Sequence, residues 1–337
     1  MKTYRALAAA LTGLTLFSGA IWITVTQPVL PRRPGAVEAP AVDPERLRAH
    51  VEILSERFVP RDWRHVENLD RAAVYISQQL AGAGASVTEQ AYRMQSNNEN
   101  QGKTYRNVVA RLGPDTRERI VVGAHYDAYS EYPAADDNAS GVAALIEVTR
   151  LLARESLPLG VDLVAFTLEE PFAESAKGNF RTPDGGSAIH ATSMKTDGTQ
   201  VRLMLSLETM GFFSDQENSQ DVPALLLRPF YPTQGNYVMV VSNLDNALVA
   251  RRVKSAMREA SPLPVYSISA PSSVEGIDYS DHFNYWKNGY PAVMITDTAF
   301  NRNKNYHTAG DTADRLDYRR MAMVVQGVYH AVLVVAR

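Results

Sequence analysis

Several apolar runs of this 337-residue chain end in residues that can bind a metal ion or move a proton. One run ends at His125, with Asp127 two positions later, and another ends at the pair Glu169 and Glu170. Apolar runs rich in β-branched residues are typical of buried strands, and open α/β sheets bind their ligands at the C-terminal ends of strands. Residues two apart in a strand share a face, so Asp127 can orient the His125 imidazole while that ring faces a metal.

Further acidic and imidazole side chains follow the same pattern. Asp136 and Asp137 precede a helix pattern that begins near Ser140, Glu208 ends a third apolar run, and His307 lies in a loop before the last helix. The chain has no cysteine, so any metal must be held by histidine and carboxylate side chains. Two imidazoles and three carboxylates suit zinc and its first-row neighbours, and two metals that share one carboxylate need about this many ligands. The candidate ligands are His125, Asp137, Glu170, Glu208 and His307.

The pair Glu169 and Glu170 has two interpretations. An isolated pair of glutamates is more often a solvated surface feature, as a lone histidine is more often structural. At the end of a buried strand, however, adjacent residues point differently, so one carboxylate can bind a metal while the other acts on water. Hydrolysis of an amide needs an activated water, a polarised carbonyl and a proton for the departing nitrogen, and a dimetal site with a free carboxylate supplies all three.

Strand and helix patterns alternate after the N-terminal region. Strands are predicted over residues 86–92, 105–112, 120–126, 161–168, 201–207, 237–242 and 292–296, and helices over 43–55, 66–81, 140–154, 246–259 and 317–335. The alternation predicts a three-layer α/β/α fold with a central, mostly parallel mixed sheet, preceded by an N-terminal apolar anchor helix. Two long loop segments, 171–198 and 214–236, are expected to border the active site.

The N-terminal region predicts export. Residues 1–27 combine two basic residues with an apolar run over 6–25, which is typical of a signal anchor or a signal peptide. The run continues past the small residues 18–20, which favours an uncleaved anchor over a cleaved signal peptide; a buried core helix is the remaining alternative. Residues 28–42 are predicted to be a proline-rich linker, and residues 43–337 the folded domain. The domain is therefore expected on the periplasmic or extracellular side, held at the membrane or secreted after cleavage.

The composition excludes some classes of protein. With 45% hydrophobic residues, the chain can bury a large core. The net charge of -3 and the pI near 6.2 provide no basic surface for a nucleic acid. The lack of cysteine excludes disulfides, thiolate zinc sites and a cysteine nucleophile.

Taken in order, the motifs resemble those of a known family. They are His125-x-Asp127, Asp137-Asn138-Ala139-Ser140-Gly141, Glu169-Glu170, Glu208 followed by Gly211, Ser280-Asp281-His282, and His307 with Asp311-Thr312. This set resembles the co-catalytic dizinc exopeptidase family, which includes bacterial leucyl aminopeptidases, glutamate carboxypeptidases and glutaminyl cyclases. The resemblance covers residues 43–337 and identifies that region as a zinc peptidase catalytic domain.

The resemblance implies a metal role for each candidate ligand. It implies that Asp137 bridges two zinc ions. His125 and Glu208 would complete one site, and Glu170 and His307 would complete the other. Many members of the family carry aspartate at the position of Glu208, so this chain has a longer ligand there.

The resemblance also implies roles for residues that do not bind metal. Glu169 would be the general base, which takes a proton from water and passes it to the leaving amine, and Asp127 would support His125. Asp281 and His282 would bind substrate by lining the cleft and would help to stabilise the oxyanion; the alternative is a structural role for this loop. The run Ser280-Asp281-His282 does not indicate a serine hydrolase, because three consecutive residues cannot form a triad and the chain has no Gly-x-Ser-x-Gly motif.

The predicted function is a metal-dependent exopeptidase, in particular an aminopeptidase, that acts on peptides. One alternative is a glutaminyl cyclase, which would use a single zinc ion and would not need all five ligands. A carboxypeptidase would need a cation such as Arg302 for the substrate carboxylate. A non-catalytic, receptor-like ectodomain would have lost ligands, and none is lost here. The sequence indicates neither the oligomeric state nor the preferred substrate side chain; the candidate pocket walls are Phe212-Phe213, Tyr231, Tyr285-Trp286 and Phe300.

Overall fold

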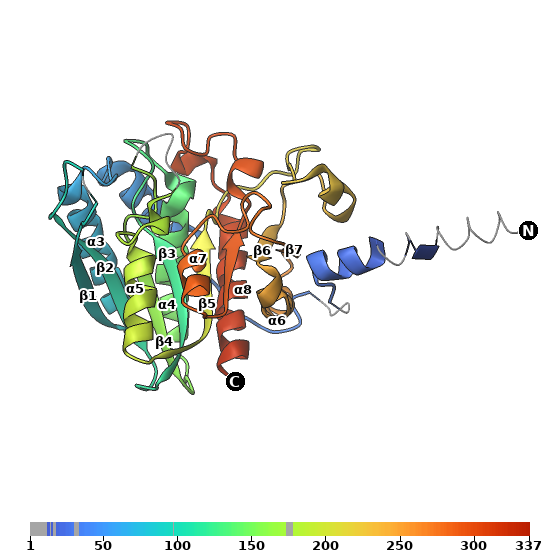
Figure 1. The fold of residues 1–337 in the computed structure, drawn as a ribbon, viewed down its shortest axis with the longest axis horizontal. Helices are drawn as coiled ribbons and strands as arrows, with labels where there is room; N and C mark the ends of the chain where they lie inside the picture. The colour runs from blue at the N-terminus through green and yellow to red at the C-terminus, as the bar shows by residue number, and fades with distance from the viewer. Residues whose placement is uncertain (1–11, 14, 16–17, 30–33, 97, 173–177) are drawn as a thin grey trace, which may run out of the picture.

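Strands from the whole length of the domain form one mixed sheet (Figure 1). The computed structural model describes residues 12–337 except for 14, 16–17, 30–33, 97 and 173–177. Within these residues the sheet has eight strands in the order β1-β2-β4-β3-β5-β8-β6-β7. The strands are β1 Ser86–Arg93, β2 Thr104–Leu112, β3 Glu118–His125, β4 Gly160–Phe166, β5 Gln200–Glu208, β6 Val238–Ser242, β7 Val265–Ser269 and β8 Ala292–Thr296.

The centre of the sheet is parallel. Strand β3 pairs in parallel with both β4 and β5, and β5 pairs in parallel with β8. Strands β6 and β7 are also parallel to each other, whereas β1 with β2, β2 with β4 and β6 with β8 are antiparallel. The carboxyl ends of β4, β3, β5 and β8 therefore meet at one edge of the sheet, where an open α/β sheet places its ligands.

Helices cover both faces of the sheet (Figure 1). One face carries α2 Pro44–Glu52, α3 Val66–Gly82, α4 Gly141–Leu152, α6 Ala247–Ala260 and α8 Tyr318–Ala336, which enclose the larger apolar core. The other face carries α5 Gly186–Thr196 and α7 His282–Lys287 over a smaller core. The short helical turns are η1 Ile53–Arg57, η2 Ala135–Ser140, η3 Asn179–Arg181, η4 Leu225–Phe230, η5 Leu244–Asn246, η6 Ala299–Asn301 and η7 Ala313–Arg315. The predicted three-layer α/β/α arrangement is confirmed for this part of the chain.

The first helix of the domain begins where its capping residues predict. The side chain of Asp43 accepts a hydrogen bond from the backbone N–H of Glu45 at 3.0 Å, and Pro44 occupies the first turn. The first backbone N–H groups of a helix have no partner within the helix. Asp43 accepts a hydrogen bond from one of them, and Pro44 has no N–H to satisfy.

Three elements differ from the prediction. Strand β7 was not predicted, because Val265–Ser269 is short and two of its five residues are serine. The predicted loop over 171–198 contains α5, whose sequence, rich in Gly, Ser, Ala and Thr, lacks an amphipathic pattern. Helix α7, which has six residues and begins at His282, was also not predicted; the motif at its start predicted substrate-binding residues instead.

The N-terminal region is described only in part. No helix within the described residues is long and apolar enough to cross a membrane. Residues 6–11, 14 and 16–17 of the predicted anchor over 6–25 lie outside the described residues, and residues 18–26 are helical. The described part of the linker lies against the domain: Gly35 and Val37 donate backbone hydrogen bonds to the C-terminal turn of α6, and Gln326 of α8 donates to the Pro40 carbonyl.

Candidate metal centre

The five candidate ligands meet at the carboxyl edge of the parallel strands. His125 is the last residue of β3 and Glu208 the last of β5, while Glu170 lies four residues beyond the end of β4. Asp137 comes from η2, in front of α4, and His307 comes from the loop between η6 and η7. Four of these side chains are buried, and that of His307 is 24% exposed.

Asp137 lies between two groups of ligands. Its Oδ1 is 3.2 Å from His125 Nε2, and its Oδ2 is 3.0 Å from His307 Nε2. On one side, Glu208 Oε1 is 3.4 Å from His125 Nε2; on the other, Glu170 Oε2 is 3.3 Å from His307 Nε2. Two sets of three ligand atoms, each set within 4.8 Å, therefore share this one carboxylate.

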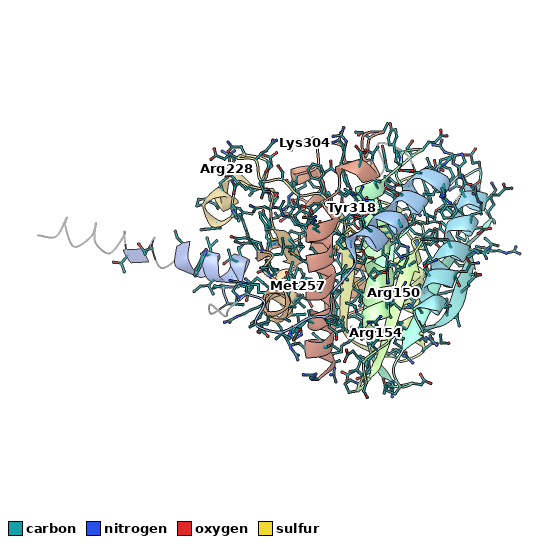
Figure 2. The ribbon with its side chains drawn as sticks, turned by 180° about the vertical axis from the view of Figure 1, so that it is seen from behind. Arg150, Arg154, Arg228, Met257, Lys304 and Tyr318 are labelled. Carbon is teal, nitrogen blue, oxygen red and sulfur yellow. The ribbon has the colours of Figure 1, made fainter. Side chains whose placement is uncertain are left out.

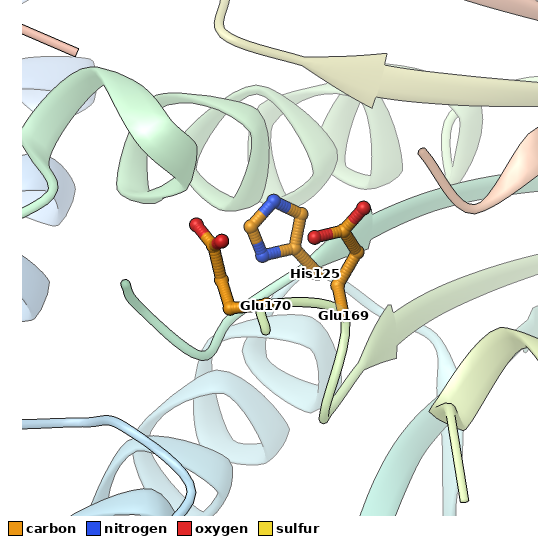
Figure 3. Close-up of side chains that lie close together, drawn as sticks. All are labelled: His125, Glu169 and Glu170. Atoms are coloured by element: carbon orange, nitrogen blue, oxygen red, sulfur yellow. The ribbon is translucent and has the colours of Figure 1, made fainter. Parts of the chain in front are cut away.

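Glu169 lies at the same centre without belonging to either set. A third group of ligand-type atoms within 4.8 Å consists of His125, Glu169 and Glu170. Figure 3 shows the two glutamate carboxylates on opposite sides of the His125 ring. Burial raises the pKa of Glu169 well above its usual range, opposed by His125 and reinforced by the carboxylates of Glu170 and Glu208. A carboxylate with a raised pKa is suited to exchange a proton near neutral pH.

The donor set fits a divalent cation. Buried oxygens of Asp137 (Oδ1) and Glu170 (Oε1) accept no hydrogen bond, which is costly unless a cation compensates them. Burial raises the pKa of Glu170 to about 7 and that of Glu208 to about 8. Burial lowers the pKa of His307, but Glu170 and Asp137 outweigh this effect and raise it to about 10. The cluster therefore attracts protons or a metal, and its histidine and carboxylate donors suit zinc.

The carboxylate of Asp127 supports both strand ends. His125 Nδ1 lies 3.2 Å from the backbone carbonyl oxygen of Asp127 and 3.5 Å from its Oδ1, which accepts the backbone N–H of Glu169 at 3.1 Å. Its Oδ2 accepts the backbone N–H of Glu170 at 3.0 Å. The sequence predicted the partnership with His125, but the two backbone bonds, which hold the glutamate pair, were not predicted.

Two further side chains hold the segment that carries Asp137. The Asp311 carboxylate accepts the backbone N–H groups of Asp136 and Asp137 at 3.1–3.2 Å. The Asn138 side chain donates to the Leu207 carbonyl at 2.8 Å and accepts from the Thr209 N–H at 3.1 Å. The bridging candidate is thereby tied to the end of β5, which carries Glu208.

A buried arginine fixes the loop between β3 and η2. The guanidinium of Arg61 has no exposed surface and donates to four backbone carbonyls at 2.6–3.0 Å, those of Leu54, Tyr126, Pro133 and Ala134. Burial lowers its pKa to about 10, although nearby carboxylates oppose the shift. No periodicity or motif around Arg61 indicated this role.

His307 and Glu208 also have partners that orient them. The His307 ring is stacked between Tyr129 at 4.1 Å and Tyr306 at 3.8 Å, measured between ring centroids. The hydroxyl of Ser280 donates to Glu208 Oε2 at 2.6 Å. Within the motif Ser280-Asp281-His282, the serine is thus the residue that contacts a candidate ligand.

The placement of Asp281 and His282 gives no support to the predicted substrate role. Both side chains are buried, and neither lines the cavity at the metal centre. His282 Nε2 lies 2.8 Å from the Ile277 carbonyl oxygen, and burial lowers the pKa of the imidazole to about 4. Burial raises the pKa of Asp281 to about 6. The sequence motif did not show that a helix begins at His282 and that both side chains are buried.

A cavity of about 540 Å³ opens beside the ligands and Glu169. Its walls come from both predicted long loops, including Arg181 of the first and residues 220–223 of the second, so the expectation that these loops border the site is confirmed for their described residues. The apolar part of the wall consists of Tyr231, Tyr237, Met239, Val241, Ile268 and Met294. Of the aromatic candidates, Tyr231 and Phe300 line the cavity, whereas the pairs at 212–213 and 285–286 do not.

Four non-glycine residues with positive φ surround the centre. They are Ala134 (50°), Leu168 (60°), Thr209 (48°) and His307 (57°), each a ligand or within three residues of a ligand. Such backbone conformations cost about 1–3 kcal/mol each and persist where surrounding contacts impose them. The hydrogen bonds of Asp127, Asp311 and Asn138 provide contacts of that kind.

A sheet edge that brings together two imidazoles, buried carboxylates and a neighbouring free carboxylate is the arrangement of a metal-dependent hydrolase. Comparison with known families agrees with this interpretation. Residues 107–332 match the sequence model of peptidase family M28. Because this match covers more than half of the chain, the chain belongs to peptidase family M28. It is therefore a hydrolase of the peptidase class, and its histidine and carboxylate donors suit zinc.

Individual proteins resemble the chain over most of its length. The uncharacterized protein YfbL of Escherichia coli is 42% identical over 293 residues, which cover 85% of this chain and 86% of that protein. A probable leucine aminopeptidase of Arthroderma otae is 25% identical over 68% of this chain, and the match spans 57% of that protein's own length.

Solved structures share the fold. A leucine aminopeptidase precursor from Bacteroides thetaiotaomicron superposes with a TM-score of 0.68 at 19% identity, over 88% of this chain and 99% of that one. The glutaminyl cyclase of the same organism has a TM-score of 0.64 at 18% identity, with the same coverage. At these identities the likeness concerns the fold alone.

Proposed function

We propose that this protein is an aminopeptidase that uses two zinc ions and Glu169 to remove N-terminal residues from peptides. The observation that carries the proposal is the sharing of Asp137 between two complete sets of ligand atoms, with Glu169 beside them. His125, Asp137 and Glu208 would hold one ion, and Asp137, Glu170 and His307 the other. Bound zinc would supply a water of lowered pKa and polarise the substrate carbonyl.

Glu169 is positioned to move the proton in this reaction. Its side chain is buried, lines the cavity and is held by the Asp127 bond to its backbone. As a carboxylate it would accept a proton from the attacking water. As a carboxylic acid it would then give that proton to the leaving nitrogen when the amide bond breaks. Burial raises its pKa, which favours the carboxylic acid form that the second transfer needs.

The cavity favours an N-terminal residue with an apolar side chain. Its wall of tyrosine, methionine and aliphatic residues can bury such a side chain next to the ligands. A carboxypeptidase would need a free cation, but Arg302 is buried, bonded to Gln220 and absent from the cavity wall. Among the described lining residues, Arg181 carries a guanidinium, and it is already paired with Asp278 at 3.0 Å.

A glutaminyl cyclase is the second candidate, because such an enzyme shares the fold. A single zinc ion would need only one set of ligands, whereas this chain provides both. Zinc stoichiometry and cyclisation of N-terminal glutamine therefore separate the two functions.

We also propose that residues 1–27 anchor the protein in a membrane, with the catalytic domain on the periplasmic or extracellular side. This follows from the basic start and the apolar run over 6–25. Fractionation of cells that express the full chain, with and without alkaline extraction, checks the anchoring.

The decisive experiment compares the purified full chain with Glu169→Gln on a panel of aminoacyl-nitroanilides. We expect the variant to lose about 10²- to 10⁴-fold in kcat while it retains bound zinc. Glu67→Gln, an exposed change on α3, is the matched control and should keep full activity. Two bound zinc ions without turnover of free N-terminal residues would refute the aminopeptidase, and product formation from N-terminal glutamine would favour the cyclase.

A further inference from the structure

Two leucines project from the edge of the molecule next to the cavity loop. Leu225 is 78% exposed and Leu226 is 74% exposed, at the start of η4. Isolated exposed leucines are common on protein surfaces, but adjacent side chains this exposed form a protruding apolar tip. We call these two residues the Leu225–Leu226 tip.

The tip is built on a fixed base. The next residue, Leu227, is buried in an apolar cluster with Tyr231, and Pro229 lies inside the short helix. The segment from Val222 to Tyr237 contains no acidic residue and has the exposed Arg228 as its charged side chain. The tip is therefore apolar with a positive flank, and no acidic side chain of that segment opposes contact with an anionic surface.

The N-terminal helix leaves the domain beside this tip. Val25, near the end of the helical residues 18–26, packs on the same apolar cluster as Val222 and Phe230 of the loop. Figures 1 and 2 show that η4, marked by Arg228 in Figure 2, and the N-terminal helix project from the same side of the molecule. On that helix Trp22 is 40% exposed and Ile23 is 55% exposed.

Three hydrogen bonds hold the end of this helix on the domain. The buried ammonium of Lys254 on α6 donates to the carbonyls of Thr26 at 2.6 Å and Gln27 at 2.5 Å. The hydroxyl of Ser267 on β7 donates to the Thr26 carbonyl at 2.7 Å. A cation at the carbonyl end of a helix satisfies acceptors that the helix leaves free and complements its dipole.

We propose that the Leu225–Leu226 tip inserts into the interfacial layer of the phospholipid bilayer that the N-terminal apolar run enters. The hydrogen bonds from Lys254 and Ser267 hold the N-terminal helix next to the loop that carries the tip. A bilayer that surrounds the N-terminal helix would therefore contact the tip. Exposed Trp22 suits the interface, where aromatic residues are enriched, and Arg228 suits anionic headgroups. This inference rests on the proposed anchoring of residues 1–27.

The absence of cysteine allows a direct test with the full chain. Leu226→Cys would carry an environment-sensitive fluorophore in vesicles of phosphatidylethanolamine and phosphatidylglycerol, with or without bromine on the acyl chains. Val74→Cys is the matched control, since Val74 is also exposed at 48% but lies on α3 near the opposite edge of the sheet. We expect blue-shifted emission and bromine quenching at position 226 and neither effect at position 74. Leu225→Asp added to the labelled chain should reduce the quenching, because a carboxylate resists transfer into the apolar layer.

Each other outcome overturns the proposal. Equal quenching at both positions would mean that the probe, rather than the tip, enters the lipid. No quenching at position 226 in chains that float with the vesicles would show an anchored domain held away from the bilayer. A blue shift without bromine quenching, accompanied by dimers, would assign the tip to a second copy of the chain. Failure of the chain to float with vesicles would remove the anchoring itself, whereas the hydrolysis of aminoacyl-nitroanilides would remain a separate test of the proposed function.

Discussion

Two groups of buried carboxylates lie next to each other at the carboxyl edge of the sheet, and they differ in what surrounds their oxygens. In the ligand cluster, Asp137 Oδ1 and Glu170 Oε1 accept no hydrogen bond. Both oxygens of Asp137 and the Oε2 atom of Glu170 face imidazole nitrogens at 3.0–3.3 Å. In the second group, which we call the amide-bound cluster, the oxygens of Asp136, Asp297 and Asp311 accept bonds from backbone N–H groups.

The difference separates a metal site from a structural clamp. Burial raises the pKa of Asp311 to about 7 and that of Asp297 to about 6, so both groups consist of carboxylates that burial disfavours as anions. Backbone amides compensate one group, and the other has no comparable donors. Residue type and burial alone would not distinguish the two clusters; the partners of each oxygen do.

Removing an imidazole should have the largest effect on the ligand cluster. In His125→Ala or His307→Ala, one set of ligands is reduced to two carboxylates, so we expect loss of zinc from that set and activity at background level. Metal analysis after dialysis, together with nitroanilide hydrolysis, measures both effects. His65→Ala, outside the cluster, is the control. Full zinc content and activity in either ligand variant would contradict the assignment.

Neutralising one carboxylate in each cluster should produce opposite results. Glu170→Gln removes charge repulsion, so the metal-free protein should be as stable as the wild type or more stable, while zinc affinity falls. Asp311→Asn leaves one of two buried N–H groups without a full acceptor and should lower the free energy of unfolding by about 1–3 kcal/mol. Urea unfolding of the metal-free proteins and zinc titration separate the two effects. Equal destabilisation by both variants would contradict the distinction between a metal site and a structural cluster.

The pH dependence of stability should differ in sign between the metal-free and the zinc-loaded protein. Glu170 (pKa about 7), Glu208 (about 8) and His307 (about 10) all have pKa values above those of an unfolded chain. Because the metal-free fold then binds more protons than the unfolded chain, its stability should fall as pH rises from about 5 to 9. Zinc needs the deprotonated ligands, so its affinity should rise by about tenfold or more per pH unit. Thermal unfolding of both forms across this range checks the signs, and parallel slopes would contradict the ligand assignment.

The smallest expected effect concerns the orientation of one ligand. Tyr129→Leu removes one of the two rings that stack on His307 and should weaken zinc binding by about 3- to 10-fold, since such a ring contact contributes about 0.5–1.5 kcal/mol. Competition with a chelator at fixed pH measures the change. Tyr132→Leu, at a ring that contacts Tyr129 but has no stacking contact with His307 among the described pairs, is the control. An equal loss in the control would assign the effect to the loop.

The sequence predicted the central strands of the sheet, and the candidate ligands that end them, for one physical reason. A buried parallel strand is a continuous apolar run, so a charged residue directly after it, such as His125 or Glu208, is conspicuous and must lie at the ligand edge. The sequence does not mark strand β7 and helix α5 in this way. Their serine, glycine and alanine residues leave neither a continuous apolar run nor a regular spacing of apolar residues.

The residues that hold the ligands could not be predicted in the same way. Arg61 donates to carbonyls up to 73 positions away, and Asp311 accepts from amides 174 and 175 positions away. Partners of this kind depend on how loops converge, and side-chain type does not reveal them. The same limit applies to Asp281 and His282, which were predicted to bind substrate: the motif did not show that both side chains are buried and do not line the cavity.

The clamp formed by Asp311 has a consequence for how long a metal ion stays bound. Its carboxylate holds the N–H groups of two consecutive residues, of which Asp136 belongs to the amide-bound cluster and Asp137 to the ligand cluster. Asp137 therefore cannot swing away from an ion unless the bonds of Asp136 also open. Zinc exchange would then proceed at the rate of this local opening, and amide hydrogen exchange at Gly211, which donates to Asp136, should report the same opening.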